Sequence, residues 1–269
     1  MSPIPLWVEP CAGSLAVGLR LLGLPRLVGW MGGKGGYADA ILHALHLQPR
    51  QGAREIWLAD VSDWAVCWEA LAQPGVAHEA AQIIEEWAVD AGPRRMWEIL
   101  RAQPTTPDAW GVARWLVLIA TSHPVRFPGH SCAWRPDGTR AGNAKGFDYI
   151  AARLRMFPPG GLPLRVWRDA RAIPPAPGVV LLDPPYDGTA GYGFGDLPRS
   201  EVLALADRWT AAGATVAICE HDPIPGWHAV DLIAAGARSL GSRRMRRTSE
   251  WLSVRGVEPR RPVAQLGLL

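Results

Sequence analysis

The sequence lacks the features of a membrane or secreted protein. Among its 269 residues no apolar run approaches the length of a membrane span, and residues 1–5 lack the basic and apolar regions of a signal peptide. The four cysteines, Cys11, Cys67, Cys132 and Cys219, are widely scattered and match no disulfide or metal-ligand spacing. We therefore expect a cytoplasmic protein with free buried thiols and no metal site.

The chain also lacks a large net charge. The net charge is +3, which permits nucleic-acid binding without arguing for it, because only clustering of the basic residues would be informative. Tyr and Phe have four copies each, whereas Trp has 14, and we expect most Trp side chains in the core and a few as stacking surfaces. With 48% hydrophobic residues the chain can bury a full core, and its length suits either one large α/β domain or one domain that carries an insertion.

The segment 179–186, Val-Val-Leu-Leu-Asp-Pro-Pro-Tyr, carries the strongest functional signal. Its four apolar residues predict a strand buried on both faces, which the prolines end because they cannot donate to a sheet ladder. Asp183 supplies an acceptor, the prolines fix the direction of backbone carbonyls such as that of Pro184, and Tyr186 offers a π face. These groups suit a planar amine on an aromatic base. An ordinary strand with a proline-rich turn is the alternative.

The run Asp183-Pro184-Pro185-Tyr186 resembles the signature tetrapeptide of the DNA amino-methyltransferases, and in particular of their adenine-specific D12 class. The resemblance implies an α/β, Rossmann-like sheet, mostly parallel with a C-terminal antiparallel hairpin, and a smaller helical insertion for target recognition. It also implies S-adenosyl-L-methionine as cofactor and duplex DNA with a flipped-out base as partner. Asp rather than Ser before Pro-Pro-Tyr favours adenine N6 as the methylated atom, with cytosine N4 as the nearest alternative.

The first predicted strand, 6–8, leads into a small-residue turn and a helix over 14–22 that its first residue, a serine, caps. Such a unit holds nucleotide-like ligands over the strand end, although Gly-x-Gly-x-x-Gly is absent. Glu9 suits an amino group of the ligand, and Gly13 permits close approach to the backbone. Resemblance to the family's first motif assigns this turn, with Pro10, to the cofactor.

A glycine-rich segment with one lysine precedes a helix predicted over 38–47. Its amides and ammonium suit a carboxylate at a helix start, and a plain glycine linker is the alternative. It resembles the Trp-x-Gly-Gly-Lys of DNA adenine methyltransferases, which contacts the methionine part of the cofactor, so Trp30 and Lys34 are expected to do so. In that family the segment usually precedes the Glu-Pro strand, whereas here it follows.

Two more acids lie at the ends of predicted strands, Asp60 in the strand 55–60 and Asp169 in the strand 164–170. An acid at this position commonly accepts ribose hydroxyls, and capping of the next helix is the alternative for Asp60. Resemblance to the family's second motif favours the ribose. In related enzymes an acid before the catalytic strand accepts the adenine amine of the cofactor, which implies that role for Asp169; a surface turn residue is the alternative.

Residues 73–147 differ in character, since predicted helices lead into a long loop rich in glycine and arginine. We expect a methyltransferase core over 1–72 and 148–269, and a target-recognition insertion over 73–147, which this block resembles. Its basic, amide and aromatic side chains suit phosphates and base edges, with a solvated loop as the alternative. The segment 243–254 resembles the family's closing hairpin. Candidate DNA-binding residues are Arg126, Arg135, Arg140, Asn143, Lys145, Arg244 and Arg246.

The sequence thus predicts a DNA adenine-N6 methyltransferase that flips its target base and transfers the methyl group directly, without a covalent enzyme intermediate. Two alternatives from other classes remain. One is a catalytically inactive DNA-binding module of the same fold, against which the intact tetrapeptide argues. The other is a small-molecule methyltransferase, which would not need the basic insertion.

Overall fold

The computed structural model describes residues 2–28, 34–90, 93–123, 133–134, 144–186, 197–233 and 249–260. Over these residues the chain is an α/β protein whose main sheet has seven strands in the order β5-β2-β1-β6-β7-β9-β8. Most pairs are parallel, and β9 runs antiparallel to both β7 and β8. The predicted Rossmann-like fold with a C-terminal antiparallel pair is therefore confirmed.

Strands β1, β6 and β7 of the main sheet lie where apolar runs precede turn residues. The bounds of the strands in this sheet are β1 Ile4–Glu9, β2 Ala53–Ala59, β5 Leu164–Trp167, β6 Val179–Leu182, β7 Thr215–Glu220, β8 His228–Asp231 and β9 Trp251–Arg255. Strand β6 is buried from Val180 to Leu182, as its apolar run predicts. Strand β8 was not predicted, because its four residues include a histidine and an aspartate. Only Val230 is buried in it.

The chain divides into two compact units. One holds Met1–Leu24, Gly33–Ala59 and Asp169–Leu269, and the other holds Pro25–Gly32 and Asp60–Arg168. The second unit is wider than the insertion 73–147 expected from the sequence, because the helix α3 (Asp63–Leu71) packs against α6 (Ala109–Thr121) within it.

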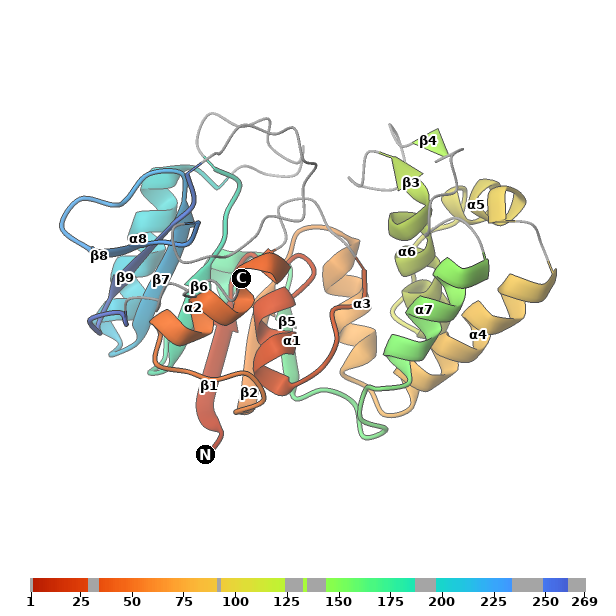
Figure 1. Ribbon diagram of the computed structural model, residues 1–269, viewed down its shortest axis with the longest axis horizontal. Helices are drawn as coiled ribbons and strands as arrows, with labels where there is room; N and C mark the ends of the chain where they lie inside the picture. Colours follow the sequence, from red (N-terminus) through yellow and green to blue (C-terminus); the bar gives the residue numbers. More distant parts are fainter. Residues whose placement is uncertain are drawn as a thin grey trace, which may run out of the picture. The chain divides into compact units, whose positions relative to one another are not determined.

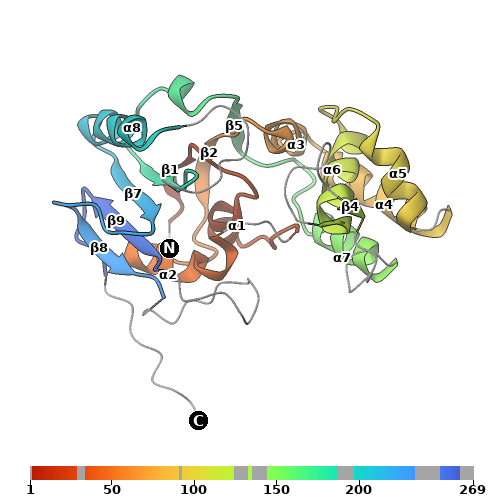
Figure 2. The same ribbon diagram turned by 90° about the horizontal axis from the view of Figure 1, so that it is seen from above.

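In the first unit, helices cover both faces of the sheet. Figure 2 shows α8 (Arg199–Ala211) on one face and α1 (Ala16–Leu22) with α2 (Ala38–Ala44) on the other. Two short 3₁₀ helices, η1 (Lys34–Gly36) and η2 (Ala170–Ala172), complete this unit. Covering on both faces explains why β6 reads as a continuous apolar run rather than as an alternating one.

The start of α1 corrects one prediction. The sequence suggests that Ser14 caps this helix, but α1 begins at Ala16, after Leu15 in the left-handed region with a φ of 49°. The side chain of Glu9 takes over the capping role, because its Oε1 accepts a hydrogen bond of 2.7 Å from the backbone amide of Gly18 in the first turn. The helix ends at Gly23 with a φ of 78°, as predicted.

The second unit is mainly helical. Besides α3 and α6 it contains α4 (Val76–Asp90), α5 (Pro93–Arg101) and α7 (Ala144–Leu154), and a small antiparallel pair formed by β3 (Ser122–His123) and β4 (Ala133–Trp134). The apolar helix α6 is central, since α3, α4, α5 and α7 all pack against it. Figure 1 shows α4, α6 and α7 side by side.

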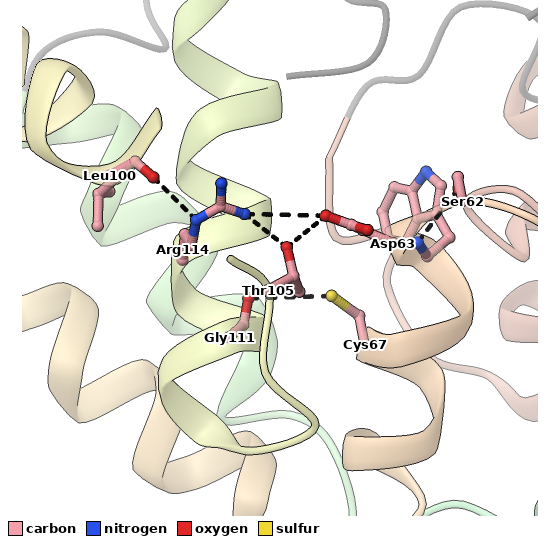
Figure 3. Close-up of polar contacts among 8 residues, drawn as sticks. Ser62, Asp63, Cys67, Leu100, Thr105, Gly111 and Arg114 are labelled. Carbon is pink, nitrogen blue, oxygen red and sulfur yellow. Dashed lines mark hydrogen bonds and ion pairs between the residues drawn. The ribbon is translucent and has the colours of Figure 1, made fainter. Parts of the chain in front are cut away.

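A buried arginine links α6 to its neighbours in this unit (Figure 3). Arg114 donates from Nε to the Leu100 carbonyl at 2.8 Å and from Nη1 to the Thr105 hydroxyl at 2.5 Å. Thr105 in turn donates to the carboxylate of Asp63, at the start of α3. Burial lowers the pKa of Arg114, and the nearby Asp63 partly offsets this. The network fixes the segment before α6 against two helices.

Over the described residues, no helix is both long and apolar enough to cross a membrane. Cys67 and Cys219 are free, buried thiols, as the sequence predicts, whereas Cys11 is only half-buried. Burial raises the pKa of Cys67 and of Cys219, so both thiols stay protonated at neutral pH. Cys132 lies outside the described residues.

Candidate functional site

The topology of the sheet brings acidic residues to one edge. Strands β1 and β6 are parallel neighbours, with Val8 opposite Val180. Glu9, the last residue of β1, and Asp183, the residue after β6, therefore lie at the same edge of the sheet. Strand β7 ends there too, and because β9 is antiparallel to it, the start of β9 at Trp251 lies opposite the end of β7 at Glu220. Glu250, the residue before β9, therefore reaches this edge as well.

Lys34 lies among these acids, although it comes from η1. Its side chain is buried, with 7% exposed, and its Nζ lies 2.6 Å from Oδ1 of Asp183 and 3.5 Å from Oε1 of Glu250. The same ammonium lies 4.9 Å from the centre of the Tyr186 ring. Burial alone would lower the pKa of Lys34, but Asp183, Cys219 and Glu250 more than offset it, so that the pKa is raised. Lys34 is therefore charged at neutral pH.

Asp183 follows β6, and 20% of its side chain is exposed. Burial raises the pKa of Asp183 from 3.8 to about 6, and the attraction of Lys34 limits this rise. The carboxylate is therefore mainly ionised at pH 7 but able to take up a proton slightly below it. Pro184 is buried and Pro185 is half-buried, so the predicted tetrapeptide is packed against the unit rather than exposed as a surface turn.

Tyr186 is held by two residues that the sequence analysis did not identify as part of the site. Its hydroxyl donates to Oε1 of Glu250. Its ring meets that of His221 edge to face, with centroids 4.5 Å apart, and His221 Nδ1 donates to the Ser249 carbonyl at 3.1 Å. Burial raises the pKa of Tyr186, so it remains a phenol that donates a hydrogen bond. The contact with Glu250 depends on the antiparallel register of β9, which no local pattern reveals.

Glu9 lies buried at the end of β1. Its Oε1 accepts hydrogen bonds from the Trp7 indole at 2.8 Å and from the Gly18 amide at 2.7 Å. Burial is the main reason why the pKa of Glu9 is raised from 4.5 to about 8, and the charge of Asp183 adds to the effect. At neutral pH Glu9 is therefore mostly protonated, with one oxygen engaged in holding the start of α1.

We expect the wild type to lose stability as the pH rises, and the Glu9→Gln variant to lose much less. Glu9 titrates at about 8 when folded and near 4.5 when unfolded, so its contribution is fully present below pH 4.5 and is lost as pH rises through 8. Gln keeps the Oε1 acceptor but does not ionise. Urea unfolding at pH 5 and pH 8 should show that the wild type loses about 2–4 kcal/mol more than the variant. Parallel curves for the two proteins would contradict a raised pKa.

The two remaining acids make local contacts. Asp60 Oδ1 accepts from the backbone amide of Ser62 at 2.8 Å, and Ser62 caps α3 by accepting from the amide of Trp64. Asp169 caps η2 by accepting from the amide of Arg171 at 2.8 Å and pairs with the Arg171 guanidinium at 3.3 Å. The contacts of Asp169 fit the turn alternative, whereas Ser62 and not Asp60 caps α3, so the capping alternative for Asp60 is wrong. The ribose and adenine roles of the two acids stay predictions.

The remaining predicted site residues belong to the turn after β1 and to the basic candidates for DNA binding. Pro10 is buried, and Gly13 has a φ of 46°, a backbone conformation that glycine adopts readily. Lys145 lies in the first turn of α7. The other predicted ligand and DNA contacts lie outside the described residues: Trp30, Arg126, Arg135, Arg140, Asn143, Arg244 and Arg246.

The edge thus combines an ion pair with an aromatic ring. Across the described part of the chain, no group of three or more His, Cys, Asp or Glu side chains could hold a metal ion. What the edge does hold is a cationic nitrogen, between the Asp183 carboxylate and the Tyr186 ring. A scan against protein-family models and a search of curated proteins found no match for this chain.

Proposed function

We propose that this chain transfers a methyl group from S-adenosyl-L-methionine to the N6 amine of adenine in DNA. One observation carries the proposal: Oδ1 of Asp183 holds a nitrogen at 2.6 Å, and the same nitrogen lies 4.9 Å from the centre of the Tyr186 ring. A carboxylate and a ring that jointly hold the ammonium of Lys34 can jointly hold the exocyclic amine of a flipped base. An ordinary strand followed by a proline-rich turn would not require Lys34, Asp183 and Tyr186 to lie together.

In the proposed reaction Asp183 accepts a hydrogen bond from the target amine, the Pro184 carbonyl is the second acceptor, and Tyr186 stacks on the base. The two acceptors draw the nitrogen lone pair out of conjugation with the ring, which makes the nitrogen a better nucleophile. The cofactor, when bound, supplies the methyl group as a sulfonium. As the bond from nitrogen to the methyl carbon forms, the carbon–sulfur bond of the sulfonium would break and leave a neutral thioether. The nitrogen loses one proton in this step, and Asp183, with a pKa of about 6, can hold that proton and release it to water.

The residues at this edge fit a cationic cofactor. A sulfonium is a cation, and at this edge the carboxyl groups of Asp183 and Glu250 both face the ammonium of Lys34, which favours a further positive charge nearby. The cofactor would be held by residues from the turn after β1, the glycine-rich segment and the acids that follow the strands: Glu9, Pro10, Gly13, Trp30, Lys34, Asp60, Asp169 and Asp183. Contacts to DNA would fall to the seven basic and amide candidates of the insertion and the C-terminal segment.

A methyl-transfer assay tests this function directly. The purified chain is incubated with tritiated S-adenosyl-L-methionine and duplex DNA, and the DNA is then digested to nucleosides. We expect the label in N6-methyladenine, whereas label in N4-methylcytosine would assign the reaction to the other amine. Free nucleosides as acceptors test for a small-molecule enzyme. Absence of transfer to any DNA, including the genomic DNA of an expression host that lacks adenine methylation, would contradict the proposal.

We expect kcat/KM for methyl transfer to rise with pH through about 6, because only ionised Asp183 can take up the proton that the amine loses, and the carboxylate is the stronger hydrogen-bond acceptor. Burial raises the pKa of this group from 3.8, so the rise falls well above the range of an ordinary aspartate. Initial rates at a low DNA concentration, measured from pH 5 to pH 8, give the profile. A rate that is flat over this range would show that Asp183 is ionised throughout it.

A further inference from the structure

Glu250 makes two contacts at the candidate site with a single oxygen. Its Oε1 accepts the hydrogen bond from the Tyr186 hydroxyl and lies 3.5 Å from the ammonium of Lys34. The side chain is buried, with 10% of its surface exposed. A buried carboxylate needs such partners, because an ionised group removed from water without them is strongly disfavoured.

Lys34 occupies a position on Asp183 that the target amine could also take. Its ammonium lies 2.6 Å from Oδ1 of Asp183, the carboxylate that accepts from the target amine in the proposed reaction. When the amine takes this oxygen the ammonium moves off it, and a buried ammonium that moves away from one carboxylate is stabilised by a second one close by. Glu250 is the second carboxylate within reach, since a shift of less than one ångström would bring 3.5 Å to the length of an ordinary ion pair.

We propose that Glu250 is a positioning residue of this site: it holds the Tyr186 ring through the phenol and receives the Lys34 ammonium when the target amine takes its place on Asp183. This inference rests on the proposed function. It implies that Lys34 occupies the amine position of Asp183 until the substrate arrives. It also implies that Glu250 acts on two steps, the placement of the base by Tyr186 and the movement of the Lys34 ammonium away from Asp183.

Three variants separate the two contacts. Glu250→Gln keeps an acceptor for the phenol but removes the charge that receives Lys34, so we expect the KM for DNA to rise about fivefold to tenfold with a smaller fall in kcat. Tyr186→Phe keeps the ring but removes its hydrogen bond, so we expect kcat to fall about tenfold with little change in KM. Glu250→Leu removes both contacts and should combine the two effects.

The control is Asp207→Asn, which breaks an exposed ion pair of 2.6 Å between α8 and Arg255 of β9 and leaves the site untouched. The assay measures kcat and KM for DNA, and thermal unfolding measures the folded fraction of every variant. Kinetics of Glu250→Gln and Glu250→Leu within twofold of the control would overturn the inference. So would a fall in kcat that follows the folded fraction with KM unchanged, because a purely structural residue behaves in that way. A wild-type chain that transfers no methyl group would instead overturn the proposed function, and this inference with it.

Discussion

Replacing Asp183 with alanine or asparagine is expected to lower the rate of methyl transfer to DNA by about 10³-fold or more, to the limit of detection. Alanine removes the acceptor for the amine and the place for its proton. Asparagine keeps the size of the side chain and one acceptor oxygen, but it cannot take up a proton and does not attract Lys34 as the carboxylate does at 2.6 Å. The loss in both variants would therefore reflect charge and proton transfer rather than shape.

Binding of the cofactor separates a catalytic role for Asp183 from a general loss of the site. We expect the dissociation constant for S-adenosyl-L-methionine, measured by titration calorimetry, to change by less than about threefold, because other residues share its binding. Asp207→Asn is the matched control, since it removes one aspartate from an exposed ion pair. Unaltered turnover in both Asp183 variants would exclude Asp183 from the mechanism.

The fold was predictable because the central parallel strands β1, β6 and β7 combine an apolar run with turn residues after it. Strand β6 is the clearest example, since four apolar residues end at two prolines that cannot extend a ladder. The start of α1 was predicted wrongly, because Ser14 is a good capping residue by type, while the actual partner of the Gly18 amide is Glu9 on β1. Local preference does not contain such a contact between a strand and the helix that follows it.

The candidate site was predictable as a set of residues and not as an arrangement. The sequence marks Lys34 and Asp183 as separate contacts to ligands, whereas the structure joins them in one buried ion pair. It gives no sign of Glu250, because the approach of Glu250 to Tyr186 follows from the pairing of β9 with β7. Burial, which raises the pKa of Glu9 and of Asp183, likewise depends on neighbours distant in the sequence.

Gly111 in α6 shows how far tertiary packing can reverse an expectation from local preference. Alanine favours helix over glycine by about 1 kcal/mol, so sequence reasoning predicts that Gly111→Ala stabilises the protein. In the structure a Cβ at this position would lie 1.9 Å from the Thr106 carbonyl oxygen and 2.7 Å from the Thr106 nitrogen. Both are backbone atoms, so no side-chain rotation relieves the clash, and the segment itself would have to move.

That movement would also disturb the polar network of the second unit. Thr105, next to Thr106, links the guanidinium of Arg114 to the carboxylate of Asp63 (Figure 3). Displacing Thr105 leaves the buried Arg114 with fewer partners, which adds to the steric cost. The clash and the lost contacts both oppose the gain in helix preference, and together they are larger.

We therefore expect Gly111→Ala to lower the free energy of unfolding by about 3 kcal/mol or more, as measured by urea denaturation followed by far-UV circular dichroism. Gly160→Ala is the matched control from the same unit, because a Cβ there meets no heavy atom within 4 Å. Its free energy of unfolding should change by less than about 0.5 kcal/mol, as is usual for exposed positions. If Gly111→Ala were as stable as the control or more stable, the segment at Thr106 would not pass α6 as closely as described. The Arg114 network, which depends on that passage, would then also need a different geometry.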